Sequence, residues 1–377
     1  MSLAGGFQKY FVDDVLPNDT QEVRLHILDG MRGWAALSVV LFHFFYELFG
    51  SLFPVFRADY AHFLTNGPFA VVIFFILSGQ ALSVSYIQQR NRESLNRMAI
   101  KRYPRLAIPA LASCFIVYTL MKCGLVWNVQ AAKIVGRQDW LGSFINVDPS
   151  FVGMLKDGLF NAFVSFSDYN FFLWTMKYEL LGSALVFALL YAYRFLISPV
   201  VICLLLGFIS LAPAPFISCF FFGVAFSLFH ANGFFEKLRE NKAWQYLGPT
   251  LLAMIVAIDV VYCKQSDQID RLHILIALLF VFVAQTNKIL SRFFEMKLSQ
   301  ILGKLSFPVY LVHLAVLVSV TSWMIVRLPA APSMADALMI GGAGVVLSYL
   351  VAVIFLPVEV FTARVGTMLA GFKIGKA

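Results

Sequence analysis

Two basic side chains in the first apolar run of the sequence have a spacing that suits chemistry inside a membrane. The run HILDGMRGWAALSVVLFHFF places Arg32 and His43 eleven residues apart. In an α-helix this spacing puts both on one face, about 16 Å apart along the axis. Ionisable groups at such depth are costly unless they line a cavity or meet a partner, so the default interpretation is functional. The alternative is structural: Arg32 extends to the headgroups, and His43 bonds a neighbouring helix.

Later apolar runs carry further candidates for the same site. Glu47 follows His43 by one turn and is placed to accept its other ring proton, which would fix the tautomer of the imidazole. Glu179 lies within NFFLWTMKYELLGS, where a carboxylate needs a partner, and we expect Arg32 or His43 to supply it. The run GKLSFPVYLVH adds Tyr310 and His313. We predict catalytic roles for His43, Arg32 and Glu179, and treat the other three residues as secondary candidates.

A basic run before the third apolar segment suits a phosphate-bearing ligand. In NRESLNRMAIKRYPRLAIPA, Arg102 and Arg105 flank a Tyr-Pro pair at the start of the apolar stretch. Two guanidinium groups beside free backbone N–H donors can hold phosphate oxygens in bidentate fashion. A nucleotide-bearing donor such as coenzyme A would fit. The alternative is that these residues only anchor the chain at the inner membrane face, as Arg90, Arg92 and Arg97 do.

The elements that must position these residues are membrane helices. Hydrophobic residues make up 60% of the chain and charged residues only 13%, which excludes a soluble globule. We predict an all-α transmembrane bundle forming one domain over residues 1–377. The five cysteines show no close C-x-x-C spacing, so neither a metal site nor a disulfide framework is indicated. We expect ten spans, of which the fifth and sixth are short and form a hairpin around Pro213 and Pro215. They lie near residues 29–50, 68–87, 106–126, 171–193, 197–212, 215–230, 246–263, 272–286, 307–326 and 336–361.

The distribution of basic residues predicts which side of the membrane each loop faces. With the N-terminus inside, 20 of the 29 Lys and Arg residues lie on inner segments. Both termini are therefore expected in the cytoplasm, with residues 1–26 along the membrane surface. The net charge of +8 needs no nucleic acid, because anionic lipid headgroups suffice. Residues 127–170 form the long outer segment, whose aromatic and amide side chains suit a carbohydrate, or else a pair of interfacial helices.

Five ordered segments resemble motifs of the membrane acyltransferase-3 family. LDGMRGWAALSVVLFH is similar to its opening motif, an Arg and a His separated by ten residues, here Arg32 and His43. FFILSG (residues 74–79) resembles its second-span motif, and KRYPRL resembles its Arg-x-x-Arg motif, here Arg102 and Arg105. LWTMKYE and LGKLSFPVYLVH resemble its later Glu-bearing and His-bearing segments. One departure is Gln80, where an aromatic or aliphatic residue is common, so we expect Gln80 to line a pocket particular to this chain.

The resemblance implies ten core helices and an acyl-CoA donor, used as a co-substrate rather than bound permanently. It also implies transfer, most often of acetyl, to a hydroxyl of a glycan or a lipid-linked sugar. We therefore expect an O-acyltransferase that spans a membrane many times, the inner or plasma membrane in a bacterium. In this hypothesis Arg102 and Arg105 bind acyl-CoA, His43 is the general base or acyl carrier, and Arg32 or a nearby dipole stabilises the oxyanion. The alternative is a multispan transporter in which the same ionisable residues form a solute or proton path.

Overall fold

The structure, a computed structural model, describes residues 25–262 except 59, 60, 62 and 63, and residues 271–374. The predicted surface segment 1–26 therefore lies almost wholly outside the described residues. The described part of the chain is built from helices and short helical turns without a strand. The predicted all-α class is confirmed.

Each of the ten expected apolar runs coincides with a helix in the structure. Five of these ten helices extend beyond the apolar run into Lys or Arg residues, because backbone hydrogen bonding does not require apolar side chains. The ten helices are α2 (His26–Leu41), α4 (Gly67–Gln89), α5 (Arg92–Lys122), α9 (Met176–Ala192), α10 (Pro199–Ser210), α11 (Pro215–Ala231), α13 (Lys242–Tyr262), α14 (Arg271–Thr286), α16 (Lys297–Val316) and α18 (Met334–Ile374).

The expected number of ten spans is not confirmed. Among the described residues, six helical segments are long and apolar enough to cross a membrane, and up to eight if two bent pairs each count as one span. One pair is α11 with α12 (Phe234–Glu240), bent by 66°, and the other is α14 with α15 (Lys288–Glu295), bent by 89°. Helix α10 has 12 residues, about 18 Å, which is short of a bilayer core of roughly 30 Å.

Close packing of α2 against α16 places the two candidate histidines in the same part of the bundle. Gly33 and Gly303 meet at this crossing: a Cβ on Gly33 would lie 2.5 Å from the backbone nitrogen of Gly303, and a Cβ on Gly303 would lie 2.4 Å from the carbonyl oxygen of Asp29. Small residues allow such approach between membrane helices, where close van der Waals packing drives association. A larger side chain at either glycine would separate α2 from α16.

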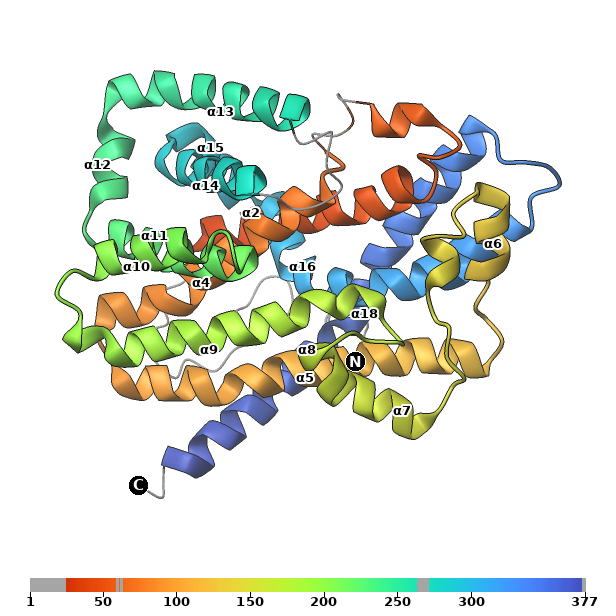
Figure 1. Cartoon of the computed structure of the whole chain (residues 1–377), viewed down its shortest axis with the longest axis horizontal. Coiled ribbons are helices and arrows are strands. Elements are labelled where there is room, and N and C mark those ends of the chain that lie inside the picture. The colour runs from red at the N-terminus through yellow and green to blue at the C-terminus, as the bar shows by residue number, and fades with distance from the viewer. Residues whose placement is uncertain (1–24, 59–60, 62–63, 263–270, 375–377) are drawn as a thin grey trace, which may run out of the picture.

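Helix α2 belongs to two hydrophobic cores. One face of α2, from Met31 to Val39, packs with α4, α11 and α14 around residues such as Ile76 and Phe220, whereas Ala36 and Val40 belong to the other core. The end of α2 continues as the π-helical turn η1 (Phe42–Glu47), which packs with α5, α16 and α18 around residues such as Phe44 and Val309. Figure 1 shows the long helices α2, α4, α5 and α9 lying side by side. The predicted site residues thus divide between two ends of one bundle.

Residues 127–170 fold as a compact cap at one end of that bundle. They include α6 (Asn128–Val135), η3 (Leu141–Ser143), α7 (Phe151–Lys156), η4 (Asp157–Asn161) and α8 (Ala162–Val164). In Figure 1, α6 lies at the upper right beside the end of the bundle, and α7 lies at the lower right below α5. The backbone N–H of Trp127 donates to the carbonyl oxygen of Val318 at 2.9 Å, and Asn128 Nδ2 donates to the carbonyl oxygens of Leu141 and Phe144 at 2.9 and 2.8 Å. The cap is therefore tied both to the bundle and to itself.

Candidate active site

His43 and His313 form a hydrogen-bonded pair. Nδ1 of His43 lies 3.0 Å from Nε2 of His313, and Nδ1 of His313 lies 2.9 Å from the carbonyl oxygen of Val309 one turn earlier on α16. His313 is fully buried, whereas His43 is half-buried. In the described part of the chain, Nε2 of His43 has no protein hydrogen-bond partner. His43 also belongs to the π-turn η1, a type of turn that occurs frequently at functional sites.

Aromatic rings hold the histidine pair in a fixed plane. The ring of Phe172 stacks on His43, with centroids 4.0 Å apart and planes 9° apart, and on His313 at 4.6 Å and 15°. The two imidazoles are themselves nearly parallel, at 8°. Trp140 from the cap lies 5.8 Å from His43, tilted by 37°. Such contacts restrict rotation of the imidazole while adding no charge.

Phe172 is positioned by a buried network that the sequence did not indicate. It lies in the 3₁₀ turn η5 (Phe171–Thr175) just before α9, and its backbone N–H is capped by Oδ1 of Asn170 at 3.1 Å. Nδ2 of Asn170 donates to Ser113 Oγ at 2.6 Å and to the carbonyl oxygen of Leu311 at 3.0 Å. The amide therefore links η5 to α5 and α16. The only available signal was an Asn directly before a helical turn, a common N-cap.

Tyr310 supports the same turn rather than the histidines directly. Its hydroxyl donates to the carbonyl oxygen of Phe172 at 2.6 Å and lies 2.9 Å from Thr175 Oγ1. The hydroxyl is thus already engaged with the backbone. We interpret Tyr310 as part of the frame around Phe172.

Glu47 does not take the place expected beside His43. Its carboxylate pairs with Arg137 of the cap, Oε2 to Nη2 at 2.6 Å, and Arg137 Nη1 also donates to the backbone carbonyl of Glu47. A charged guanidinium is a stronger hydrogen-bond donor to a carboxylate than a neutral imidazole is. His43 instead meets His313, so the expected pairing of Glu47 with His43 is wrong. The Arg137 guanidinium also lies over the ring of Trp140, 5.3 Å from its centroid.

Glu179 joins Arg102 and Arg32 in a second cluster, which we call the arginine cluster. The carboxylate of Glu179 forms an ion pair with the Arg102 guanidinium and accepts a hydrogen bond from Ser78 Oγ at 2.8 Å. Arg32 Nη2 donates to Ser78 Oγ at 3.2 Å, and Arg102 Nε donates to Ser183 Oγ at 2.7 Å. The sequence predicted Arg32 or His43 as the partner of Glu179. The ion pair is instead with Arg102, which the sequence did not indicate, and Arg32 shares the Ser78 hydroxyl with Glu179.

Arg105 differs from Arg102 in its surroundings. The Arg105 side chain is exposed, whereas Arg102 is half-buried within the arginine cluster. Arg102 and Arg105 are three residues apart in sequence, so their side chains are neighbours on the surface of α5. Of the two, Arg105 is the guanidinium more accessible to a ligand.

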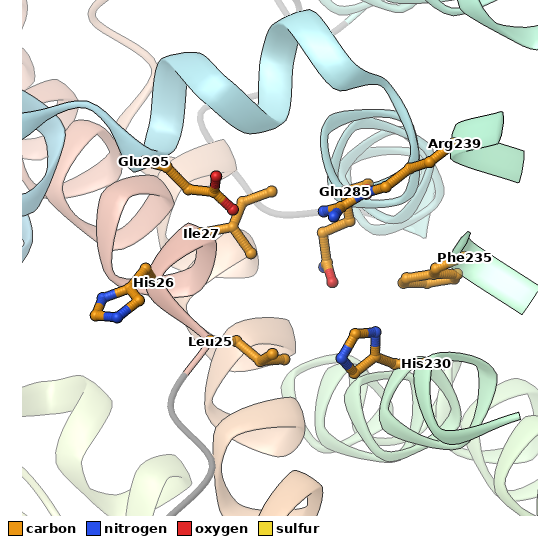
Figure 2. A pocket seen from close by; sticks show the side chains of 8 residues that line it. All are labelled: Leu25, His26, Ile27, His230, Phe235, Arg239, Gln285 and Glu295. Atoms are coloured by element: carbon orange, nitrogen blue, oxygen red, sulfur yellow. The ribbon is translucent and has the colours of Figure 1, made fainter. Parts of the chain in front are cut away.

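Two hollows of the structure lie away from these clusters. Figure 2 shows one of about 170 Å³ at the start of α2, where Gln285 and His230 point toward the same space. None of the eight predicted site residues lines this cavity or an apolar groove of about 530 Å³ between α5, α7 and α18. Gln80 was expected to line a pocket, but its side chain is fully buried. Its amide and that of Gln285 donate to each other, at 2.7 and 2.9 Å, so that both are satisfied inside the bundle.

The described residues contain no group of three His, Cys, Asp or Glu side chains close enough to hold a metal ion. What they present is a histidine pair and an arginine cluster, each of which takes one member, His43 and Arg32 respectively, from the continuous helical segment α2–η1. Along α2, Arg32 and His43 are separated by about 16 Å. The histidine pair is thus the group whose chemistry suits proton transfer, and the arginine end is the group whose charge suits an anionic ligand.

The fold and the site define a multi-pass helical membrane protein with a half-buried, partly unpartnered imidazole. The family model Acyl_transf_3, described as an acyltransferase domain, matches residues 25–357, which is nearly the whole chain. The chain belongs to this family and is a membrane acyltransferase. No curated protein and no solved structure matches it. The family assignment favours the predicted transferase over the transporter.

Proposed function

We propose that the protein is an O-acyltransferase that moves an acyl group, acetyl by expectation, from cytoplasmic acyl-CoA to a hydroxyl of a glycan or lipid-linked sugar. The observation that carries the proposal is His43: a half-buried imidazole within the helix bundle, held by His313 and Phe172, whose Nε2 forms no hydrogen bond to the described residues. Histidine is well suited to proton transfer near neutral pH. Acyl transfer to a hydroxyl needs such a base.

The reaction can be written around Nε2 of His43. Nε2 removes the proton of the acceptor hydroxyl while the hydroxyl oxygen attacks the thioester carbonyl. The carbon–sulfur bond then breaks, and the imidazolium returns the proton to the departing CoA thiolate. If His43 is instead a transient acyl carrier, Nε2 attacks the thioester carbonyl first and CoA leaves as the thiolate. The acceptor oxygen then attacks the acyl-imidazolium, the bond from the acyl carbon to Nε2 breaks, and the acceptor proton passes to the thiolate.

We assign Arg32 to the donor side, which changes its expected role. An oxyanion forming at His43 would be too far from Arg32, about 16 Å along α2. We propose instead that acyl-CoA enters from the inner face beside the arginine cluster, whose positive charge would attract its phosphates. Arg105, which is exposed, is the better phosphate ligand. Arg102 is already paired with Glu179, and we propose that it keeps this partner and adds positive potential.

The acceptor side is assigned to the cap. Trp140 lies beside His43, and its indole offers an aromatic face of the kind on which sugar rings stack. Phe172 covers one face of the His43 imidazole, and His313 occupies its Nδ1 edge. An acceptor hydroxyl would therefore approach His43 from the side of residues 127–170.

Purified protein in lipid nanodiscs tests the function directly. Incubated with acetyl-CoA and a crude extract of envelope glycans, the wild type should release CoA, and mass spectrometry should show glycans heavier by one acetyl group. His43→Ala should release none above background. Acceptor-dependent CoA release that is equal in wild type and His43→Ala would contradict the proposal.

Cysteine labelling at the two ends of α5 can test which side of the membrane each end faces. Cys123 is exposed at its far end and Gln88 is exposed just before its start. In intact cells producing a Cys263→Ser variant, an impermeant maleimide should label Cys123. After Gln88→Cys and Cys123→Ser are added, labelling should require permeabilised cells. The reverse pattern would invert the proposed orientation.

A further inference from the structure

The hydrogen bonds of the histidine pair determine where its protons lie. The carbonyl oxygen of Val309 can only accept, so Nδ1 of His313, 2.9 Å away, must carry a proton. A neutral imidazole has one ring proton, so Nε2 of His313 is then an acceptor. Its partner, Nδ1 of His43 at 3.0 Å, must therefore be the donor. In a neutral His43 this leaves the lone pair on Nε2.

Both rings are neutral in this arrangement for a physical reason. His313 is fully buried, and in the described part of the chain no carboxylate lies within ion-pairing distance of either imidazole. An uncompensated charge in such surroundings costs several kcal/mol. The opposite tautomer would place an unprotonated Nδ1 of His313 against the Val309 carbonyl, two acceptors 2.9 Å apart.

We infer that His313 is a positioning residue that fixes the tautomer of His43, so that Nε2 is the reactive nitrogen. The inference rests on the proposed role of His43 in acyl transfer. When Nε2 takes the acceptor proton, His43 becomes a cation whose Nδ1–H still donates to His313. That hydrogen bond is then charge-assisted and strengthens as the reaction proceeds. His313 thus accepts the Nδ1–H of His43 as a neutral imidazole, a role that a carboxylate could also fill.

The surrounding frame supports this role. Phe172 stacks on both imidazoles and keeps their planes within 15° of its own, so neither ring can turn freely to exchange its nitrogens. The backbone acceptor for His313 lies on α16 itself, four residues earlier. The tautomer is therefore set by the helix that carries His313 and is passed to α2 through one hydrogen bond.

Nitrogen-15 NMR of ring-labelled histidine tests the tautomer in the resting protein. Signals are assigned by comparison with His43→Ala and His313→Phe. In the wild type, Nδ1 of both His43 and His313 should be protonated and Nε2 of both should not. His313→Phe keeps an aromatic ring but removes the acceptor. In this variant the signals of His43 should report a mixture of the two neutral tautomers, one protonated at Nδ1 and the other at Nε2. A protonated Nε2 on His43 in the wild type would overturn the inference.

Kinetics supply the second readout. His313→Phe should lower kcat by roughly 10- to 100-fold, less than loss of the base itself, with little change in the KM for either substrate. His313→Gln, whose Oε1 can accept from Nδ1 of His43, should recover part of that loss. His230→Gln, a histidine replacement beside Glu236, is the matched control and should behave as wild type. An unchanged kcat in a folded His313→Phe variant would overturn the inference.

The two proposals fail in different ways. If the wild type transfers no acyl group, the proposed function fails, while the NMR result on the resting protein still stands. If the wild type is active and His43→Ala is not, but the tautomer is reversed, only the role of His313 fails.

Discussion

The arginine cluster and the histidine pair differ in how completely their polar atoms are satisfied by protein. In the arginine cluster, Glu179 binds both Arg102 and Ser78, and Arg102 also binds Ser183. In the histidine pair, a chain of hydrogen bonds ends at His43, whose Nε2 has no partner among the residues that the structure describes. Charges inside the bundle demand partners. A neutral imidazole does not, and so it can keep one nitrogen for a substrate.

Removing the imidazole should give the largest loss of activity with little loss of stability. His43→Ala should lower kcat by roughly 10²- to 10⁴-fold, the usual contribution of a general base. Donor affinity should be retained, because the arginine cluster is intact. Turnover and acyl-CoA binding by monodisperse purified protein measure both quantities. Near wild-type turnover would remove His43 from the mechanism.

The arginine cluster should show the opposite pattern, a large loss of stability. Arg102→Ala leaves the Glu179 carboxylate without its partner, and Glu179→Ala does the same to Arg102. Each should lower the free energy of unfolding by about 3–5 kcal/mol, the typical cost of breaking a buried pair. The double variant should lose less than the sum of the two.

Thermal unfolding in detergent measures these differences. Arg97→Ala is the matched control on the same helix: its partner Glu93 is exposed, so the change should be about 1 kcal/mol or less. Single variants as stable as Arg97→Ala would mean that the ion pair is not structural. Arg102 would then return to the role of a free phosphate ligand.

Sequence reasoning located the helices better than it located the contacts between them. Each expected apolar run is helical, because hydrophobic length and helix formation are local properties. The pairing of Glu47 with Arg137 instead depends on how the cap folds back over the end of η1. Arg137 lies 90 residues from Glu47. No spacing rule along one helix contains that information.

The same limit applies to the site. Arg32 and His43 could be placed on one face from their spacing alone. His313 was recognisable as a candidate, but its contact with His43 depends on the α2–α16 crossing at Gly33 and Gly303. Phe172 carries no chemical signal at all, and its importance follows only from its stacking on both imidazoles.

Donor recognition should depend on Arg105 in a way that separates it from Arg102. Arg105→Ala removes an exposed guanidinium, so stability should be unchanged while the KM for acyl-CoA rises by about tenfold and kcat changes little. Arg105→Lys should recover part of the affinity, because it keeps the charge but loses the planar fork. Arg92→Ala, exposed at the start of the same helix, is the control. An equal effect of Arg92→Ala would indicate general surface charge instead of a phosphate site.

The smallest expected effect concerns the acceptor, and it distinguishes two tryptophans of the cap. Trp140 lies 5.8 Å from His43, whereas Trp127 caps α6 and joins the bundle through its backbone. Both indoles could anchor the cap at the membrane interface, but only Trp140 is placed to contact an acceptor bound at Nε2 of His43. Trp140→Ala should therefore raise the acceptor KM several-fold, since stacking on one aromatic ring contributes about 1 kcal/mol. The donor KM should stay constant.

Trp127→Ala serves as the matched control, because it removes an indole from the same cap without touching the histidine pair. Initial rates at varied acceptor and saturating acetyl-CoA measure the difference. If Trp140→Ala lowers kcat as strongly as His43→Ala, then Trp140 is holding the imidazole in place and is not a binding surface. If both tryptophan variants leave the acceptor KM unchanged, the cap is an interfacial anchor, and the acceptor must approach His43 by another route.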